Sequence, residues 1–191
     1  MARTKEFDPK TALQGAIDVF WSKGYNRTSL DDLMQGMGIA RQSLYDTFGD
    51  KRQLYHRALE RYRDDTLTVT RAHFVEGKSV KAGFRALLLG ISQESRTHLE
   101  RGCLLLSASL EREPGDEEIG ELLADNQKSV EAIFREAIER GQKSGEIGRK
   151  KDAAALARFF TATMQGMRAM GRMHPKRKSL EPVAETALTV L

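Results

Sequence analysis

The amino-acid sequence predicts an all-α protein, and three observations support this fold class. Apolar residues recur at steps of three and four along nearly the whole chain, which is the period of an amphipathic helix. Glycine or proline separates these segments, for example at Gly24, Gly49, Pro114 and Pro175. No stretch of the sequence alternates in the β-branched pattern of a half-buried strand.

The composition excludes several classes of protein. The 191 residues are 40% hydrophobic and 30% charged, which is neither a disordered nor a fibrous composition. No apolar run approaches the ~20 residues that a membrane-spanning helix needs, and the charged start is not followed by the apolar segment of a signal peptide. A single cysteine, Cys103, cannot form an intramolecular disulfide. We therefore expect a globular, cytoplasmic protein of one large domain or two small ones.

The first predicted helix covers residues 9–23 and has well-marked ends. Asp8 is a typical N-cap residue and Pro9 suits the first helical position. Gly24 suits the left-handed residue that ends a helix. One face of this helix is apolar: Ala12, Leu13, Ala16, Ile17, Phe20 and Trp21.

A second helix is predicted to begin at Thr28 or Ser29. Ser29 and Asp32 have the spacing of a capping box, in which each side chain accepts a hydrogen bond from the other residue's backbone. The helix is expected to turn Leu30, Leu33 and Met34 inward and to end at residues 35–36. Residues 36–38, Gly-Met-Gly, would then form a tight turn.

A short helix over residues 40–47 follows this turn and would bury Leu44 and Phe48. Asp50 and Gln53 resemble a second capping box, which opens a longer helix. The inward face of that longer helix is expected to carry Leu54, Tyr55, Ala58, Leu59 and Tyr62.

Longer helices are predicted for the remainder of the chain, because the apolar period continues between the breakers. Their approximate ranges are 79–96, 102–111, 116–141, 152–173 and 180–191.

Residues 29–48 have the spacing of a helix-turn-helix, in which a first helix braces a second that enters the DNA major groove. The second helix has an exposed face that can hydrogen-bond to bases or phosphates: Arg41, Gln42, Ser43, Tyr45, Asp46 and Thr47. The basic excess lies mainly in the same third of the chain. Residues 1–63 carry 11 basic and 8 acidic side chains, whereas residues 64–191 carry 20 and 19. Helix-turn-helix spacing also occurs in plain αα-corners, so spacing alone leaves both interpretations open.

The residues at this spacing closely resemble the signature of the TetR/AcrR family of bacterial transcriptional regulators. The resemblance is carried by the Gly38 turn, by the small-polar-Leu-Tyr sequence at residues 43–45, and by Phe48 with Lys51 three positions later. A second segment, Arg-Gly-Cys-Leu-Leu at residues 101–105, is similar to one that is common in one branch of the family.

The resemblance implies a fold in two parts. Residues 6–50 would form an N-terminal three-helix helix-turn-helix DNA-binding domain, and residues 51–191 a C-terminal helical domain that binds an effector and dimerises. The implied function is a ligand-responsive transcriptional repressor that binds a pseudo-palindromic operator as a homodimer. A small hydrophobic effector would release the double-stranded DNA. A helical adaptor or a helical enzyme without DNA binding are the alternatives.

The resemblance also assigns roles at the DNA. Four side chains are expected at phosphates: Thr28, Ser29, Tyr45 and Lys51. Three are expected at base edges: Arg41, Gln42 and Ser43.

Two positions depart from the family's pattern, which usually has aromatic residues or histidine there. Thr47 can still reach a phosphate. Asp46 repels phosphate and only accepts hydrogen bonds, so it either reads a cytosine N4 amino group or turns toward Arg41 or Lys51.

The effector pocket is expected between helices of the C-terminal domain, where apolar residues recur on inward positions. The candidate lining residues are Phe84, Leu88, Cys103, Leu106, Phe134, Phe159 and Thr163. Because little side-chain polarity is present, a neutral or weakly charged hydrophobic effector is predicted. For Cys103 two interpretations stay open, packing as a small hydrophobe and redox sensing.

A homodimer is predicted from the apolar positions of the last two helices, which exceed the need of a monomer's outer layer. These positions are Ala153, Leu156, Phe160, Met164, Met167, Val183, Ala187, Val190 and Leu191.

Catalytic and metal-binding motifs are absent from the sequence, so neither an enzyme nor a cofactor is predicted. The pair Gly36 and Gly38 lacks the third glycine and the preceding strand of a dinucleotide-binding loop. Glu94 and His98 share a helix face, but a solvated pair explains them more simply than a metal site.

Overall fold

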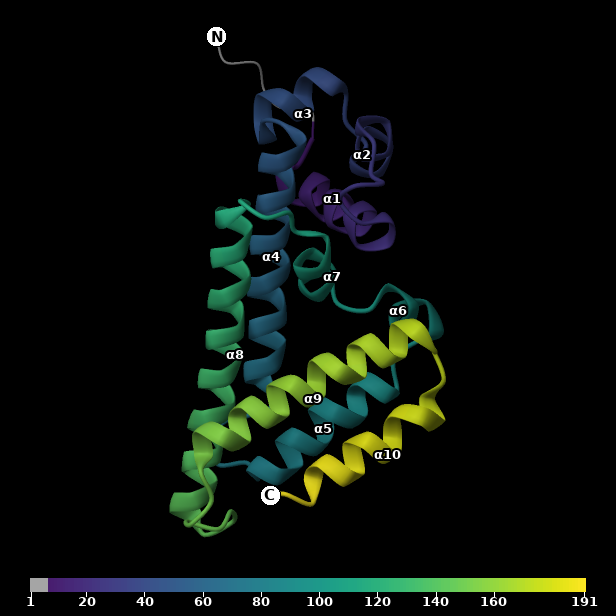
Figure 1. Ribbon diagram of the computed structural model, residues 1–191. Coiled ribbons are helices and arrows are strands. Elements are labelled where there is room, and N and C mark those ends of the chain that lie inside the picture. The colour runs from purple at the N-terminus through teal and green to yellow at the C-terminus, as the bar shows by residue number, and fades with distance from the viewer. Residues whose placement is uncertain (1–6) are drawn as a thin grey trace. The chain divides into compact units, whose positions relative to one another are not determined.

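The computed structural model describes residues 7–191, the side chain of Arg177 excepted (Figure 1). Residue 6, the first of the predicted DNA-binding domain, lies outside this part. The helices are α1 Pro9–Lys23, α2 Leu30–Met37, α3 Arg41–Phe48, α4 Lys51–Ala72, α5 Val80–Ser92, α6 Arg96–Arg101, α7 Leu104–Glu111, α8 Glu117–Ser144, α9 Ala153–Met173 and α10 Arg177–Leu188. Residues 7–191 contain no strand, which confirms the predicted all-α class.

The contacts divide the chain into two compact units. The first unit joins the residues up to Asp64 with Leu104–Gly120, and the second joins Asp65–Cys103 with Glu121–Leu191. The first unit therefore holds all of α1–α3 and α7. It is larger than the DNA-binding domain predicted at residues 6–50, although the functional boundary at residue 50 stays a prediction.

Local capping fixes the helices of the first unit as the sequence predicts. The Asp8 carboxylate accepts hydrogen bonds from the backbone N–H groups of Lys10 and Thr11. Ser29 and Asp32 form the reciprocal capping box at the start of α2. Asp50 and Gln53 do the same before α4: the Asp50 N–H donates to Gln53 Oε1 at 3.2 Å, and the Gln53 N–H donates to Asp50 Oδ1 at 2.8 Å.

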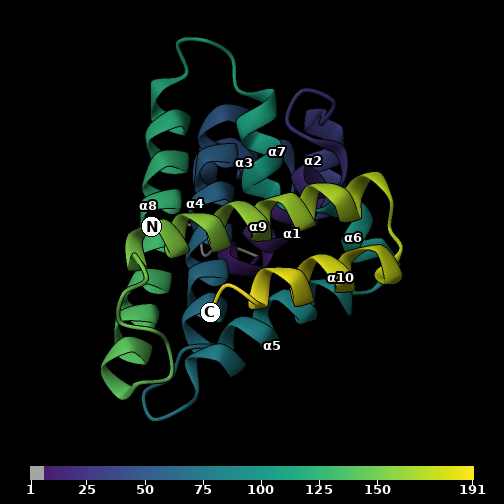
Figure 2. The ribbon, with the colours of Figure 1, turned by 60° about the horizontal axis from the view of Figure 1, so that its bottom comes forward.

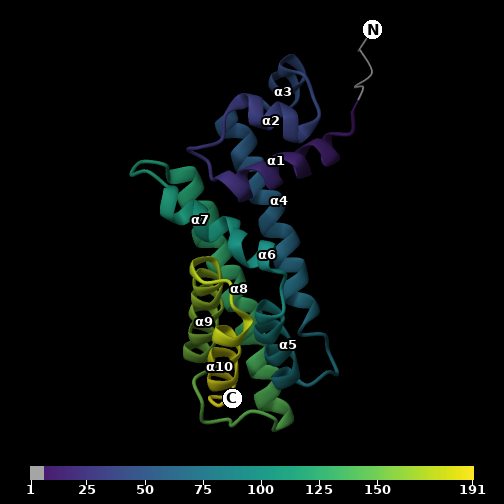
Figure 3. The ribbon, with the colours of Figure 1, turned by 90° about the vertical axis from the view of Figure 1, so that its right-hand side faces the viewer.

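The end of α2 differs from the prediction. The helix continues through Gly36 to Met37, and only Gly38, with φ 65°, adopts the left-handed conformation. Gly36 lies inside α2 because α1 and α2 approach closely there: a Cβ built on Gly15 of α1 would overlap the Gly36 carbonyl oxygen. Gly36 thus serves helix packing rather than the turn. Figure 3 shows α1, α2 and α3 gathered around the first turns of α4.

Aromatic rings join α1 to α4 within the first unit. Phe20 is fully buried and meets Tyr55 edge-on, with 4.8 Å between ring centroids. Trp21 and Tyr62, two turns further along α4, also meet edge-on, with 5.1 Å between ring centroids. These contacts hold the helix-turn-helix on α4, because large aromatic pairs stabilise beyond their buried area.

The second unit has a core of phenylalanines and aliphatic residues. Phe84 of α5 packs against Phe160 of α9 at 4.2 Å and against Phe134 of α8 at 5.2 Å between centroids. Helices α5, α9 and α10 lie side by side, as Figures 1 and 2 both show.

Two helix boundaries in the second unit were predicted wrongly. The single helix expected over residues 79–96 is two helices, because α5 ends at Ser92 and Ser95 caps a separate α6. The last helix begins at Arg177 rather than at 180, with Lys176 as an N-cap residue that makes no side-chain cap. No sequence signal therefore marked that start.

Within the described chain, no helix has both the length and the apolar character to cross a membrane.

Candidate nucleic-acid interface

Helix α3 has a buried apolar side and an exposed polar side. Leu44 and Phe48 are 1% and 3% exposed and anchor the helix. The opposite side presents Arg41, Gln42 and Tyr45 to solvent, and Asp46 lies beside them. An eight-residue helix anchored on one side and polar on the other has the dimensions and chemistry of a recognition helix.

Gln42 and Arg41, two of the residues predicted to read bases, each contact a carboxylate. The Gln42 carboxamide donates from Nε2 to Asp46 Oδ1 at 2.8 Å. The Arg41 guanidinium lies 3.5 Å from the Asp31 carboxylate of α2. Asp46 therefore does not turn toward Arg41 or Lys51, one of its two predicted roles, because the i, i+4 geometry of α3 brings Gln42 within reach instead. The other role, reading a cytosine N4 amino group, stays a prediction.

Thr28 and Ser29 have different surroundings. The Thr28 side chain is 3% exposed, and its hydroxyl donates to the Gly24 carbonyl at 2.5 Å. Its hydroxyl thus stabilises the connection between α1 and α2. Ser29 is exposed at the N-terminus of α2, where its hydroxyl oxygen accepts the Asp32 N–H. Of the two hydroxyls, only that of Ser29 is open to a phosphate.

Lys51 lies against an aromatic ring at the start of α4. Its ammonium is 4.4 Å from the centroid of the Tyr25 ring, a cation–π contact. Partial burial lowers the pKa of the Lys51 ammonium. The contact orients the lysine beside α3, where a phosphate contact is predicted.

The remaining α3 candidates differ in exposure. Tyr45 is 42% exposed, whereas Ser43 and Thr47 are half-buried. The Thr47 carbonyl accepts a hydrogen bond from the Arg57 guanidinium of α4 at 2.9 Å.

Two exposed arginines beside the motif were missed by the sequence analysis. Arg57 joins the end of α3 to α4, and Arg27 lies in the connection before α2, where its Nε donates to the Lys23 carbonyl at 3.0 Å. A search for basic residues within one turn of the motif's ends would have found Arg27. Arg57 is close to α3 only through the fold.

The residues predicted to line an effector pocket differ in their burial. Phe84, Leu88 and Phe134 are fully buried in the core of the second unit. Phe159 is 41% exposed, and the Thr163 hydroxyl donates to its carbonyl.

The other two are half-buried: Cys103 lies between α6 and α7, and Leu106 belongs to α7 in the first unit. A cavity of about 370 Å³ lies within the first unit, and none of the seven residues lines it. The pocket therefore stays a prediction.

Two family models match the chain. The model described as "Bacterial regulatory proteins, tetR family" matches residues 12–58, which contain α2, α3 and the start of α4. The model described as "Tetracyclin repressor-like, C-terminal domain" matches residues 81–187, more than half of the chain.

Known proteins are also similar to the chain over nearly its full length. The uncharacterized HTH-type transcriptional regulator YezE of Bacillus subtilis is 31% identical over 193 residues, covering 100% of both chains. The HTH-type transcriptional repressor ComR of Escherichia coli is 29% identical, covering 97% of this chain and 90% of its own. A solved structure of a cysteine mutant of the TetR family transcriptional regulator CifR, complexed with 26-bp operator DNA, is 32% identical with a TM-score of 0.87, covering 98% of each chain. By these full-length matches and its helix-turn-helix, the chain belongs to the TetR family of bacterial regulatory proteins.

Proposed function

We propose that this protein is a transcriptional repressor that binds a pseudo-palindromic operator as a homodimer and is released by a small effector. The observation that carries the proposal is helix α3, whose apolar side is buried and whose polar side faces solvent at helix-turn-helix spacing. The operator complex of CifR, a relative of nearly equal length, supports DNA as the partner.

In this proposal the side chains divide by what they contact. Arg41 and Gln42 read base edges, since guanidinium suits guanine O6 and N7 and carboxamide suits adenine N6 and N7. Lys51, Tyr45 and Ser29 bind phosphates and fix the register of the protein on the duplex. At the half-buried edge of α3, Ser43 contacts a base and Thr47 contacts a phosphate.

The apolar positions from which the sequence predicted a dimer belong to the core of the second unit instead: Phe160, Met167, Ala187 and Leu191 are buried there, and the other five pack against that core. A different, exposed stripe of small and apolar residues along α9 supports the homodimer. The stripe consists of Ala155, Phe159, Ala162, Gly166, Met170 and Met173, all exposed and spaced at three and four residues. Nothing within 4 Å covers a Cβ placed at Gly166. A second copy of α9 would bury this stripe in a two-fold contact, with two recognition helices in major grooves about 34 Å apart or a multiple of that.

The effector acts by preferring one arrangement of the two DNA-reading parts, so that its binding lowers the population that fits the operator. We place its pocket in the helical part at residues 51–191, where the family's C-terminal model matches residues 81–187.

Selection of DNA sequences bound by the full chain tests the proposal. A pseudo-palindrome should emerge, and binding to it should weaken as salt rises, with a slope near −0.9 per phosphate contact. Failure to enrich any sequence, or binding that does not respond to salt, would favour the adaptor or enzyme alternatives.

A further inference from the structure

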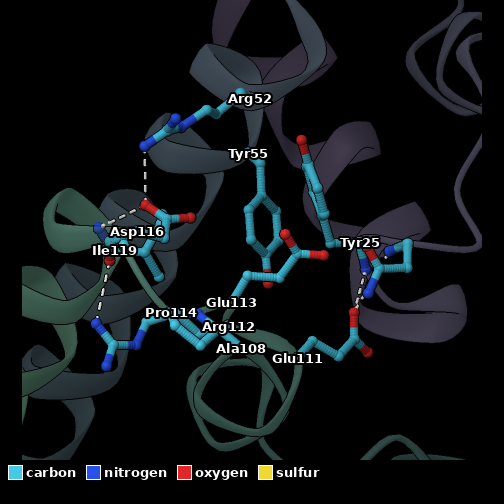
Figure 4. Close-up of a pocket in the computed structure, with 12 residues that line it drawn as sticks. Tyr25, Arg52, Tyr55, Ala108, Glu111, Arg112, Glu113, Pro114, Asp116 and Ile119 are labelled. Atoms are coloured by element: carbon cyan, nitrogen blue, oxygen red, sulfur yellow. Dashed lines mark hydrogen bonds and ion pairs between the residues drawn. The ribbon is translucent and has the colours of Figure 1, made fainter.

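The cavity in the first unit has a polar lining that the DNA-reading residues do not use (Figure 4). It is bounded by the residues after α1, by α4, and by the end of α7 with the loop that leads to α8. Its volume of about 370 Å³ is within the range of small-molecule sites. Two tyrosines, two arginines, three carboxylates and the Asn26 carboxamide provide its polar side chains, and Ala108 and Ile119 are among its apolar ones.

Most of the charged groups in the cavity wall already have partners. The Arg52 guanidinium pairs with the Asp116 carboxylate at 2.9 Å. The Arg112 guanidinium donates to the Asp116 backbone carbonyl at 3.1 Å. The Glu111 carboxylate accepts the Tyr25 N–H at 2.8 Å. These groups therefore stabilise the wall of the cavity and are already paired within the protein.

Two of the wall's polar groups that have no hydrogen-bond partner among residues 7–191 belong to Tyr55 and Glu113. Tyr55 is 6% exposed, and among residues 7–191 its hydroxyl has no hydrogen-bond partner. The Glu113 carboxylate likewise has none in this part of the chain, and Figure 4 shows it and Tyr55 pointing into the same space. Both groups line the cavity, and Figure 4 shows that a ligand there could hydrogen-bond to either of them.

The cavity favours a positive charge. The rings of Tyr25 and Tyr55 lie 4.7 Å apart, and the Tyr25 ring already attracts one cation, the Lys51 ammonium at 4.4 Å. The wall has one more carboxylate than guanidinium. Burial, with the nearby carboxylates adding to it, raises the pKa of both tyrosines, so both hydroxyls stay neutral.

We propose that this cavity binds a small organic cation with an aromatic or aliphatic body. Its ammonium or guanidinium group pairs with Glu113 and lies near the tyrosine rings, while the Tyr55 hydroxyl accepts one of its N–H groups. The body packs on Ala108 and Ile119. The site is separate from the predicted hydrophobic effector pocket, and its occupancy does not depend on whether the protein binds DNA.

Isothermal titration calorimetry on the full chain with benzylamine tests this site. Benzyl alcohol and phenylacetate serve as neutral and anionic probes of the same size. Benzylamine should bind once per chain, about tenfold or more tighter than either. Glu113→Gln should weaken benzylamine about tenfold and Tyr55→Phe by several-fold, because each removes one polar contact. Glu117→Gln, an exposed carboxylate outside the cavity, should leave the affinity unchanged.

Other results would overturn the assignment. Tighter binding of phenylacetate would show that the arginines recognise the ligand and that the cavity is an anion-binding site. Equal binding of all three probes would make it an apolar pocket. Absence of benzylamine binding at about 10 mM, or full retention of its affinity in Glu113→Gln, would remove the cation site altogether.

Discussion

The Asp46 carboxylate fixes the direction in which the Gln42 carboxamide faces. One Nε2 hydrogen is directed to Asp46, so the second Nε2 hydrogen and Oε1 are left to pair with an adenine. Asp46→Ala should therefore relax preference at the base pair read by Gln42 by about 1–3 kcal/mol, and Gln42→Ala should do the same at the same position. Competition between the operator and singly substituted duplexes measures this. If Asp46→Ala and Gln42→Ala relax preference at different base pairs, Asp46 does not act through Gln42.

Lys51 should strengthen binding to every DNA sequence equally, because an ammonium at a phosphate does not distinguish one base from another. Lys51→Ala is expected to weaken binding to every duplex and to reduce the salt slope by about 1. Lys128→Ala is the matched control, since Lys128 is exposed on α8 and paired with Asp125. If Lys51→Ala leaves the affinity and the salt slope unchanged in a folded protein, Lys51 does not contact a phosphate.

Asp32 links the capping of α2 to pH. The hydrogen bond from Lys23, with those from Ser29, lowers the pKa of the Asp32 carboxyl from 3.8 to about 2. Because the folded pKa lies below the unfolded one, the stabilisation is complete above pH 3.8 and is lost as the pH falls through about 2. The stability difference between the protein and Asp32→Asn should shrink over this window. Urea unfolding at several pH values measures it, and a difference independent of pH would show that Asp32 is not charged in this role.

At the scale of helices, the glycine contact between α1 and α2 determines how closely they cross. Gly15→Ala should destabilise the protein by about 1–3 kcal/mol, because its Cβ would meet the backbone of Gly36. Gly90→Ala is the control: Gly90 lies in α5 with open space around it, so alanine should stabilise by up to about 1 kcal/mol. Equal effects of the two substitutions in urea unfolding would exclude the close crossing.

The sequence was most informative where the interaction is local. The Asp8 cap and the capping boxes at Ser29 and Asp50 join residues at most three apart, so their types and spacing predicted them. Gly36 was misassigned because a glycine that permits helix crossing looks the same in sequence as a glycine that makes a turn.

The cavity of the first unit could not be predicted from spacing. Glu111 bonds to Tyr25, 86 residues away, and no local pattern indicates that contact. Helix periodicity likewise identified Phe84 and Phe134 as inward-facing, but not whether they surround a ligand or pack against each other, as they do at 5.2 Å.

At the scale of the whole molecule, the proposed homodimer depends on the α9 stripe. Ala162→Glu places a charge in the middle of the stripe and should convert the dimer to a monomer, because an unpaired buried charge is strongly unfavourable. Operator affinity should fall with it, since two linked half-site contacts bind far more tightly than one. Ala86→Glu on the exposed side of α5 is the control. Light scattering that finds Ala162→Glu dimeric at micromolar concentration, or the unaltered protein monomeric, would contradict this interface.

Residues 104–120 belong to the same compact unit as the helix-turn-helix, and this has a consequence for building chimaeric regulators. A DNA-reading module cut at residue 50 or 64 would be transplanted without Glu111, which accepts the N–H groups of Tyr25 and Asn26, and without Asp116, which pairs with Arg52. A graft intended to carry this protein's operator preference into another scaffold needs both segments of the chain, with junctions in α4, between α6 and α7, and in α8.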